Sequence, residues 1–143
     1  MPCKGSALRR ILLPILMFFG TFAHPVFSQE CSSKPLFVFV FDNSCRISCS
    51  RVKPAMEEIK RDYADDVDIV MIDVSPETRT QALDVAKKYG VSDFVLNSEK
   101  WYPVVGAFSS NRKCVKQLFG AHSTEEYKAV VEKLRAKEKG AAR

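Results

Sequence analysis

Short apolar runs along the chain predict four β-strands. Leu36–Phe41 and Val67–Val74 are rich in aromatic and β-branched residues and end at turn residues, a pattern typical of strands buried on both faces. Pro103–Phe108 and Val115–Phe119 are separated by Ser109–Lys113, whose polar residues suit a hairpin loop. The second half of the chain therefore predicts an antiparallel strand pair.

Amphipathic spacing predicts helices in the first half of the chain. One helix is expected from Cys45 to about Tyr63, with a kink at Pro54, because proline removes a hydrogen bond and clashes with the preceding turn. A second helix is expected to start at Ser75-Pro76-Glu77, with serine as its cap, and to end at Gly90.

The second half of the chain predicts one further helix. Ser123 is expected to cap a helix over Thr124–Lys137, and Glu138–Arg143 is expected to fray. The segment Val91–Tyr102 reads as irregular. The predicted order is βαβα followed by ββα, an α/β domain with a four-stranded mixed sheet flanked by helices, because the βαβ unit requires a parallel strand pair.

The N-terminal segment is typical of a secretory signal. Lys4, Arg9 and Arg10 precede an apolar run over Ile11–Phe22, which is short for a membrane span, and cleavage is expected after Ser28. This interpretation assigns 1–28 to a signal peptide and 29–143 to one domain. It places the protein in a secreted or periplasmic compartment, with no stable membrane insertion after cleavage. The alternative is an uncleaved membrane anchor.

Charge does not point to nucleic acid. The formal net charge is +5, but three of the positive charges lie in the signal segment, so the remaining domain is close to neutral. Cysteine is more informative, because disulfides persist outside the cytosol. Four cysteines follow the predicted cleavage point, and they are Cys31, Cys45, Cys49 and Cys114.

Two of these cysteines lie where a strand passes into a helix. Asp42-Asn43-Ser44 ends the first strand, and Cys45 and Cys49 follow. Free backbone N–H groups and the helix dipole at such a junction favour an anion, and they lower the pKa of a cysteine placed there. Arg46 adds a positive charge beside Cys45. The junction therefore predicts a reactive thiolate.

This arrangement resembles the thioredoxin superfamily over nearly all of the domain. The resemblance is carried by the strand and helix order, by a proline five residues after the second cysteine, and by three short motifs. These motifs are Tyr89-Gly90-Val91 at a helix end, Tyr102-Pro103-Val104-Val105 at the strand that opens with a cis-proline in that family, and Phe119-Gly120-Ala121 before the last helix.

The resemblance implies a thioredoxin fold and thiol-disulfide exchange on protein thiols or disulfides, with a redox partner protein and no cofactor. Cys45 would attack a substrate disulfide, Cys49 would resolve the mixed disulfide, and Pro103 would support the substrate. Four further residues are expected at the substrate-binding surface, and they are Trp101, Tyr102, Gly120 and Ala121.

The chain also departs from the family pattern. Three residues separate the cysteines where thioredoxins have two, Ser44 replaces the usual tryptophan, and the buried aspartate of the first strand falls at Phe39 or Val40. Side chains four apart on a helix have Cβ atoms about 5–6 Å apart, whereas a disulfide needs about 3.5–4.5 Å. A bridge therefore requires Cys45 to stand outside the regular helix, or the first turn to loosen.

Two alternatives remain for the cysteine pair. The Cys-x-x-x-Cys spacing resembles that of copper-binding Sco-type metallochaperones, in which case Cys45, Cys49 and His122 would bind Cu(I). The pair could instead be a static disulfide in a non-catalytic binding module.

Two features stay open in the same way. Cys31 and Cys114 are candidates for a structural disulfide, or they are unpaired thiols. The apolar residues between Phe94 and Tyr102, with Trp101 among them, form either a lip for a partner polypeptide or part of the core.

Overall fold

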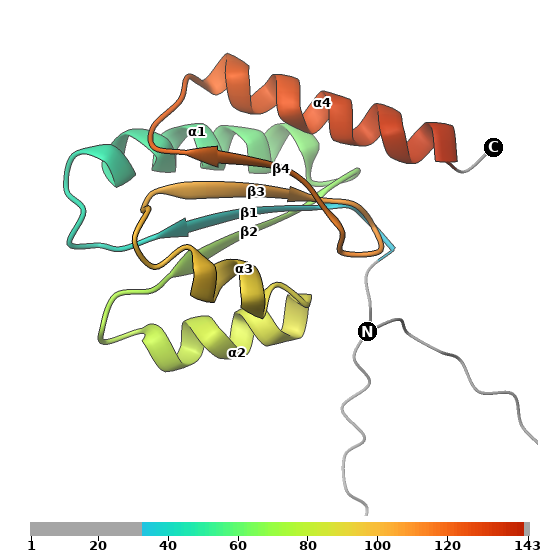
Figure 1. Ribbon diagram of the computed structural model, residues 1–143. Coiled ribbons are helices and arrows are strands. Elements are labelled where there is room, and N and C mark those ends of the chain that lie inside the picture. The colour runs from blue at the N-terminus through green and yellow to red at the C-terminus, as the bar shows by residue number, and fades with distance from the viewer. Residues whose placement is uncertain (1–32, 142–143) are drawn as a thin grey trace, which may run out of the picture. The chain divides into compact units, whose positions relative to one another are not determined.

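The computed structural model describes residues 33–141, so the expected signal segment and Cys31 lie outside the described residues. The elements, labelled in Figure 1, are β1 (Leu36–Phe41), α1 (Ser48–Tyr63), β2 (Asp68–Asp73), α2 (Arg79–Tyr89), α3 (Ser92–Asn97), β3 (Val104–Phe108), β4 (Cys114–Phe119) and α4 (Thr124–Ala141). Within this part of the chain, no helix has the length and apolar character needed to cross a membrane.

The four strands form one mixed sheet in the order β2-β1-β3-β4. β1 pairs in parallel with β2, and β3 runs antiparallel to both β1 and β4. This confirms the predicted α/β class with a four-stranded mixed sheet flanked by helices. The carboxyl ends of β1, β2 and β4 therefore lie at the same end of the sheet as the start of β3.

Helices cover both faces of the sheet. In Figure 1, α1 and α4 lie on one face, and α2 and α3 lie on the other. All six residues of the central strand β1 are buried, as predicted, because both faces are covered. Side chains alternate along the strand, so Phe37, Phe39 and Phe41 face α1 and α4. Leu36, Val38 and Val40 face α2 and α3.

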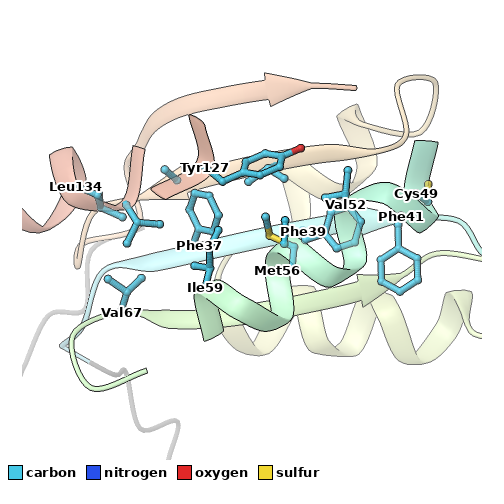
Figure 2. Packing of buried hydrophobic residues seen from close by; sticks show 14 residues of the cluster. Phe37, Phe39, Phe41, Cys49, Val52, Met56, Ile59, Val67, Tyr127 and Leu134 are labelled. Atoms are coloured by element: carbon cyan, nitrogen blue, oxygen red, sulfur yellow. The ribbon is translucent and has the colours of Figure 1, made fainter. Parts of the chain in front are cut away.

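The larger core lies between the sheet, α1 and α4. Figure 2 shows Phe37 and Phe39 of β1 beneath Tyr127 of α4, with Met56 of α1 beside them. All four side chains are fully buried. Burial of each such side chain contributes about 1.5–3 kcal/mol to folding. This core fixes α1, and therefore the cysteines at its start, against the carboxyl end of β1.

The segment predicted to be irregular contains a helix, so that prediction was wrong. α3 spans Ser92–Asn97, and its Phe94 packs edge-on against Phe108 at a ring-centroid distance of 5.2 Å. Gly106 makes the contact possible, because a Cβ there would lie 2.7 Å from Phe94. The sequence pattern missed α3 because six residues are too few to show helical periodicity, whereas this packing stabilises so short a helix.

The burial of one strand and the bounds of two helices also differ from the prediction. β2 is an edge strand with a half-buried pattern, because only one neighbour flanks it. α2 starts at Arg79, and Ser75 is not its cap, because the Ser75 hydroxyl instead bonds to Asp73 at the end of β2 and to Asp42 in the loop after β1. α4 continues to Ala141 through the segment expected to fray.

Candidate functional site

Cys45 lies in the loop between β1 and α1, at the carboxyl end of β1. The Cys45 N–H donates to the Asp42 carbonyl at 3.0 Å, and the Ser44 N–H donates to Asp42 Oδ1 at 2.7 Å. These two bonds close a turn, so α1 begins at Ser48 and not at Cys45 as predicted. Cys45 therefore stands outside the helix, which is the condition stated above for a bridge to Cys49.

The two thiols occupy unequal environments. Cys49 is 1% exposed in the first turn of α1, whereas Cys45 is half-buried. Burial raises the pKa of the Cys49 thiol to about 12, and its hydrogen bond with the Cys45 side chain and the negative charge of Asp42 act in the same direction. Cys49 is therefore protonated at neutral pH, and it becomes a nucleophile only when a base removes that proton.

The β1 interior offers no such base, as the sequence indicated. Phe39 and Val40, where the resemblance drawn from the sequence would place an aspartate, are both fully buried and apolar. The carboxylate whose charge acts on Cys49 belongs to Asp42. Hydrogen bonds from Ser44, and more weakly from Ser75, lower the pKa of this carboxyl, so it stays ionised beside the thiols.

A set of polar side chains, here called the anchoring network, surrounds the Cys45 loop. It consists of Asp42, Asn43, Lys53, Asp73 and Ser75. Sequence reasoning assigned none of them to the site. The sequence did carry a signal for them, because polar residues lie at the ends of two strands that were expected to pair in parallel. The carboxyl ends of such strands meet at one edge of the sheet.

Pro103 opens β3 on the other side of β1. It is buried, its peptide bond with Tyr102 is cis, and its carbonyl accepts a hydrogen bond of 2.8 Å from the Gly120 N–H. Gly120 has a φ of 82°, a backbone conformation that favours glycine. Tyr102 is half-buried and packs, like Cys45, against the core cluster that contains Cys49. The structure thus brings these candidate residues to the cysteine end of the sheet.

Exposed apolar side chains lie at the same end. Trp101 is 61% exposed and Phe119 is 52% exposed, and their rings meet edge-on at 6.3 Å. Ala121, the last of the four residues expected at the substrate-binding surface, is exposed in the following loop. In contrast, Phe94 and Val95 are core residues. Part of the segment is therefore core, and the role of the exposed Trp101 as a lip for a partner polypeptide stays a prediction.

His122, the third residue of the alternative copper set, is engaged elsewhere. Its Nε2 lies 3.1 Å from the Phe119 carbonyl oxygen, and its Nδ1 lies 3.4 Å from Glu126 Oε1. Binding a metal through this ring would require breaking one of these contacts. Within residues 33–141 no group of three or more histidine, cysteine or acidic side chains is arranged to hold a metal ion. Copper binding stays an untested prediction.

Cys114 starts β4 at the far end of the sheet from Cys45. It is exposed and pairs with Phe108, which itself pairs with Leu36 at the beginning of β1. Because Cys31 lies outside the described residues, the suggested disulfide between Cys31 and Cys114 stays a prediction.

Comparison with known proteins leaves the family open. The chain matches no protein-family model, and a search of curated proteins finds no match. Function must therefore be inferred from the thiols, their environment and the fold that holds them.

Proposed function

We propose that this protein is an exported thiol-disulfide oxidoreductase with a thioredoxin fold, acting on the disulfides of other proteins. One observation carries the proposal. Two thiols meet at the carboxyl end of β1, one half-buried outside the helix and one buried and protonated. Unequal thiols of this kind suit a nucleophile followed by a resolving group.

The architecture supports the proposed fold. A parallel β1–β2 pair, an antiparallel β3–β4 pair and helices on both faces (Figure 1) are compatible with it. The proposal adds that residues 1–28 direct export, which places the thiols in a compartment where disulfides persist.

The proposed reaction transfers two electrons from the protein to the substrate. The Cys45 thiolate attacks one sulfur of a substrate disulfide, which forms a mixed disulfide and releases the first substrate thiolate. Cys49 then loses its proton and attacks the Cys45 sulfur, which forms the Cys45–Cys49 disulfide. The second substrate sulfur leaves and takes up a proton, so the substrate is reduced. A partner dithiol protein would reduce the Cys45–Cys49 bridge again.

Reduction of insulin by dithiothreitol, followed by turbidity, tests the proposal directly. We expect the purified protein to accelerate insulin reduction and the Cys45→Ser variant to lose this activity. Cys114→Ser is the matched control, because Cys114 lies at the other end of the sheet, and it should retain full activity.

The Cys49→Ser variant sharpens the test. It keeps the nucleophile but cannot resolve, so it should accumulate a mixed disulfide between Cys45 and substrate that mass spectrometry detects. An inactive wild-type protein whose cysteines are fully reduced before the assay would overturn the proposed function.

A further inference from the structure

Asn43 connects the Cys45 loop to the end of the neighbouring strand. Its N–H donates to Ser75 Oγ at 2.9 Å, and its side-chain amide donates to Asp73 Oδ2. Asp73 is the last residue of β2, and Ser75 follows it in the loop to α2. Residues about thirty positions apart in the sequence therefore hold the loop that carries Cys45.

The Ser75 hydroxyl lies at the centre of the hydrogen bonds between the Cys45 loop and the end of β2. Ser75 is 4% exposed, and its Oγ lies 2.5 Å from Asp73 Oδ1 and 3.3 Å from Asp42 Oδ1. While it accepts the Asn43 N–H, its single hydrogen goes to one of these carboxylates. A buried hydroxyl with three partners is costly to remove, because the partners lose hydrogen bonds that water cannot fully replace.

The same network reaches the helix that carries the second cysteine. Lys53, one turn after Cys49 in α1, donates from Nζ to Asn43 Oδ1 at 2.7 Å. Its Nζ also lies 4.4 Å from the centre of the Phe41 ring. Asn43 thus bonds at once to the β2 end and to α1, and it lies two residues before Cys45.

We propose that Asp73 and Ser75 are positioning residues for the cysteine pair. They hold the Cys45 loop against α1 so that Cys45 and Cys49 have a high effective concentration towards each other. The assignment extends the proposed function, since it concerns the ease with which the resolving disulfide forms. A loosened loop would let Cys45 sample positions away from Cys49, and the intramolecular disulfide would become less stable relative to an external one.

The equilibrium with glutathione measures this property. The reduced protein and one glutathione disulfide give the Cys45–Cys49 disulfide and two reduced glutathione molecules, with electrons and protons balanced. We expect Ser75→Ala to lower this equilibrium constant by about five- to tenfold, the size expected from losing the bonds of one buried hydroxyl. Ser75→Thr, which keeps the hydroxyl, should restore a value near that of the wild type.

Ser110→Ala is the matched control. Ser110 also donates its hydroxyl to a carboxylate, Glu138 Oε2 at 2.7 Å, but it lies in the β3–β4 hairpin at the opposite end of the sheet. Its glutathione equilibrium should match that of the wild type. Asp73→Asn provides a second variant if Ser75→Ala does not fold, and it should shift the constant in the same direction.

Two results would overturn the assignment. One is a wild-type equilibrium constant in folded Ser75→Ala and Asp73→Asn proteins, and the other is an equal decrease in Ser110→Ala, which would indicate a general loss of stability. The readout does not depend on insulin turnover. A wild-type protein that fails with insulin but shows the predicted glutathione shift would refute the proposed function and keep the positioning role.

Discussion

The two ends of the sheet carry cysteines in opposite situations. At the cysteine-pair end, Cys45 lies in the loop that the anchoring network holds, and its side chain bonds to that of Cys49 at the start of α1. At the hairpin end, which is the end of the sheet where the β3–β4 loop lies, Cys114 is exposed, and its thiol donates to the Lys116 carbonyl oxygen at 3.8 Å.

The difference indicates which thiols suit the proposed exchange reaction. Exposure alone gives Cys114 access to reagents, but no described thiol near it is positioned to resolve a mixed disulfide. The cysteine-pair end combines a partly accessible thiol with a buried, protonated partner. Tertiary packing, more than the presence of cysteine, separates the two chemistries.

Thiol alkylation should show the largest difference between the ends. In the reduced protein at pH 8, we expect iodoacetamide to modify Cys114 at least about a hundredfold faster than Cys49, because only the thiolate reacts and the pKa of Cys49 is about 12. Mass spectrometry of peptides after timed quenching measures both rates in one sample.

The pH dependence gives the internal check on that result. Because the Cys49 pKa is raised, its alkylation rate should still climb between pH 9 and pH 11 (a span of about two units), where a thiol with the ordinary value of about 8.5 has levelled off. Equal rates for Cys49 and Cys114 at pH 8 would contradict the buried, protonated state described for Cys49.

Truncation of an exposed apolar side chain at the cysteine-pair end should have a smaller effect, which is on substrate binding. We expect Trp101→Ala to raise KM for insulin reduction about three- to tenfold with little change in kcat, because Trp101 is exposed beside Phe119 at the cysteine-pair end. Val115→Ala is the control, since Val115 is 39% exposed near the start of β4, towards the hairpin end. Identical KM values in both variants would remove Trp101 from the substrate surface.

The smallest expected effect concerns stability in acid. Hydrogen bonds from Ser44 lower the pKa of Asp42 in the folded protein. As the pH falls, the Asp42 carboxylate of the unfolded chain therefore takes up a proton at a higher pH than that of the folded protein. Asp42 therefore stabilises the fold above its ordinary pKa of about 3.9, and this contribution is lost as the pH falls below that value. Asp42→Asn should flatten the decrease in unfolding free energy between about pH 5 and pH 3 by about 0.5 kcal/mol.

Urea unfolding at several pH values measures this slope. Asp65→Asn, in the turn after α1 at the hairpin end, is the control and should keep the wild-type slope. An unchanged slope in Asp42→Asn would show that the turn before Cys45 does not depend on the ionised carboxylate.

Much of the secondary structure was predictable because its signals are local. The apolar run Leu36–Phe41 predicted a strand buried on both faces, and the structure confirms it. Ser123 Oγ accepts a hydrogen bond from the Glu126 N–H at 3.3 Å, as predicted for a helix cap. The prediction failed where tertiary contacts decide. α3 depends on the space left by Gly106, and β2 became half-buried because it is an edge strand.

The site divides in the same way. The sequence placed Cys45 and Cys49 at a strand-to-helix junction, because turn residues and a change of periodicity mark such junctions locally. It could not place the helix start after Cys45, which depends on the turn bonds of Asp42. It also could not identify Ser75 and Asp73, because their bonds to Asn43 join segments 32 and 30 residues apart.

By itself, the sequence determined the succession of strands along the chain that allows a mixed sheet, the spacing of the two cysteines and the absence of a carboxylate from β1. Only the tertiary structure decided which thiol is buried, which carboxylate acts on it and what holds the loop in place. The physical reason is that periodicity and turn chemistry act within a few residues. Burial, charge and hydrogen bonding at the site depend on segments that meet only when the sheet has formed.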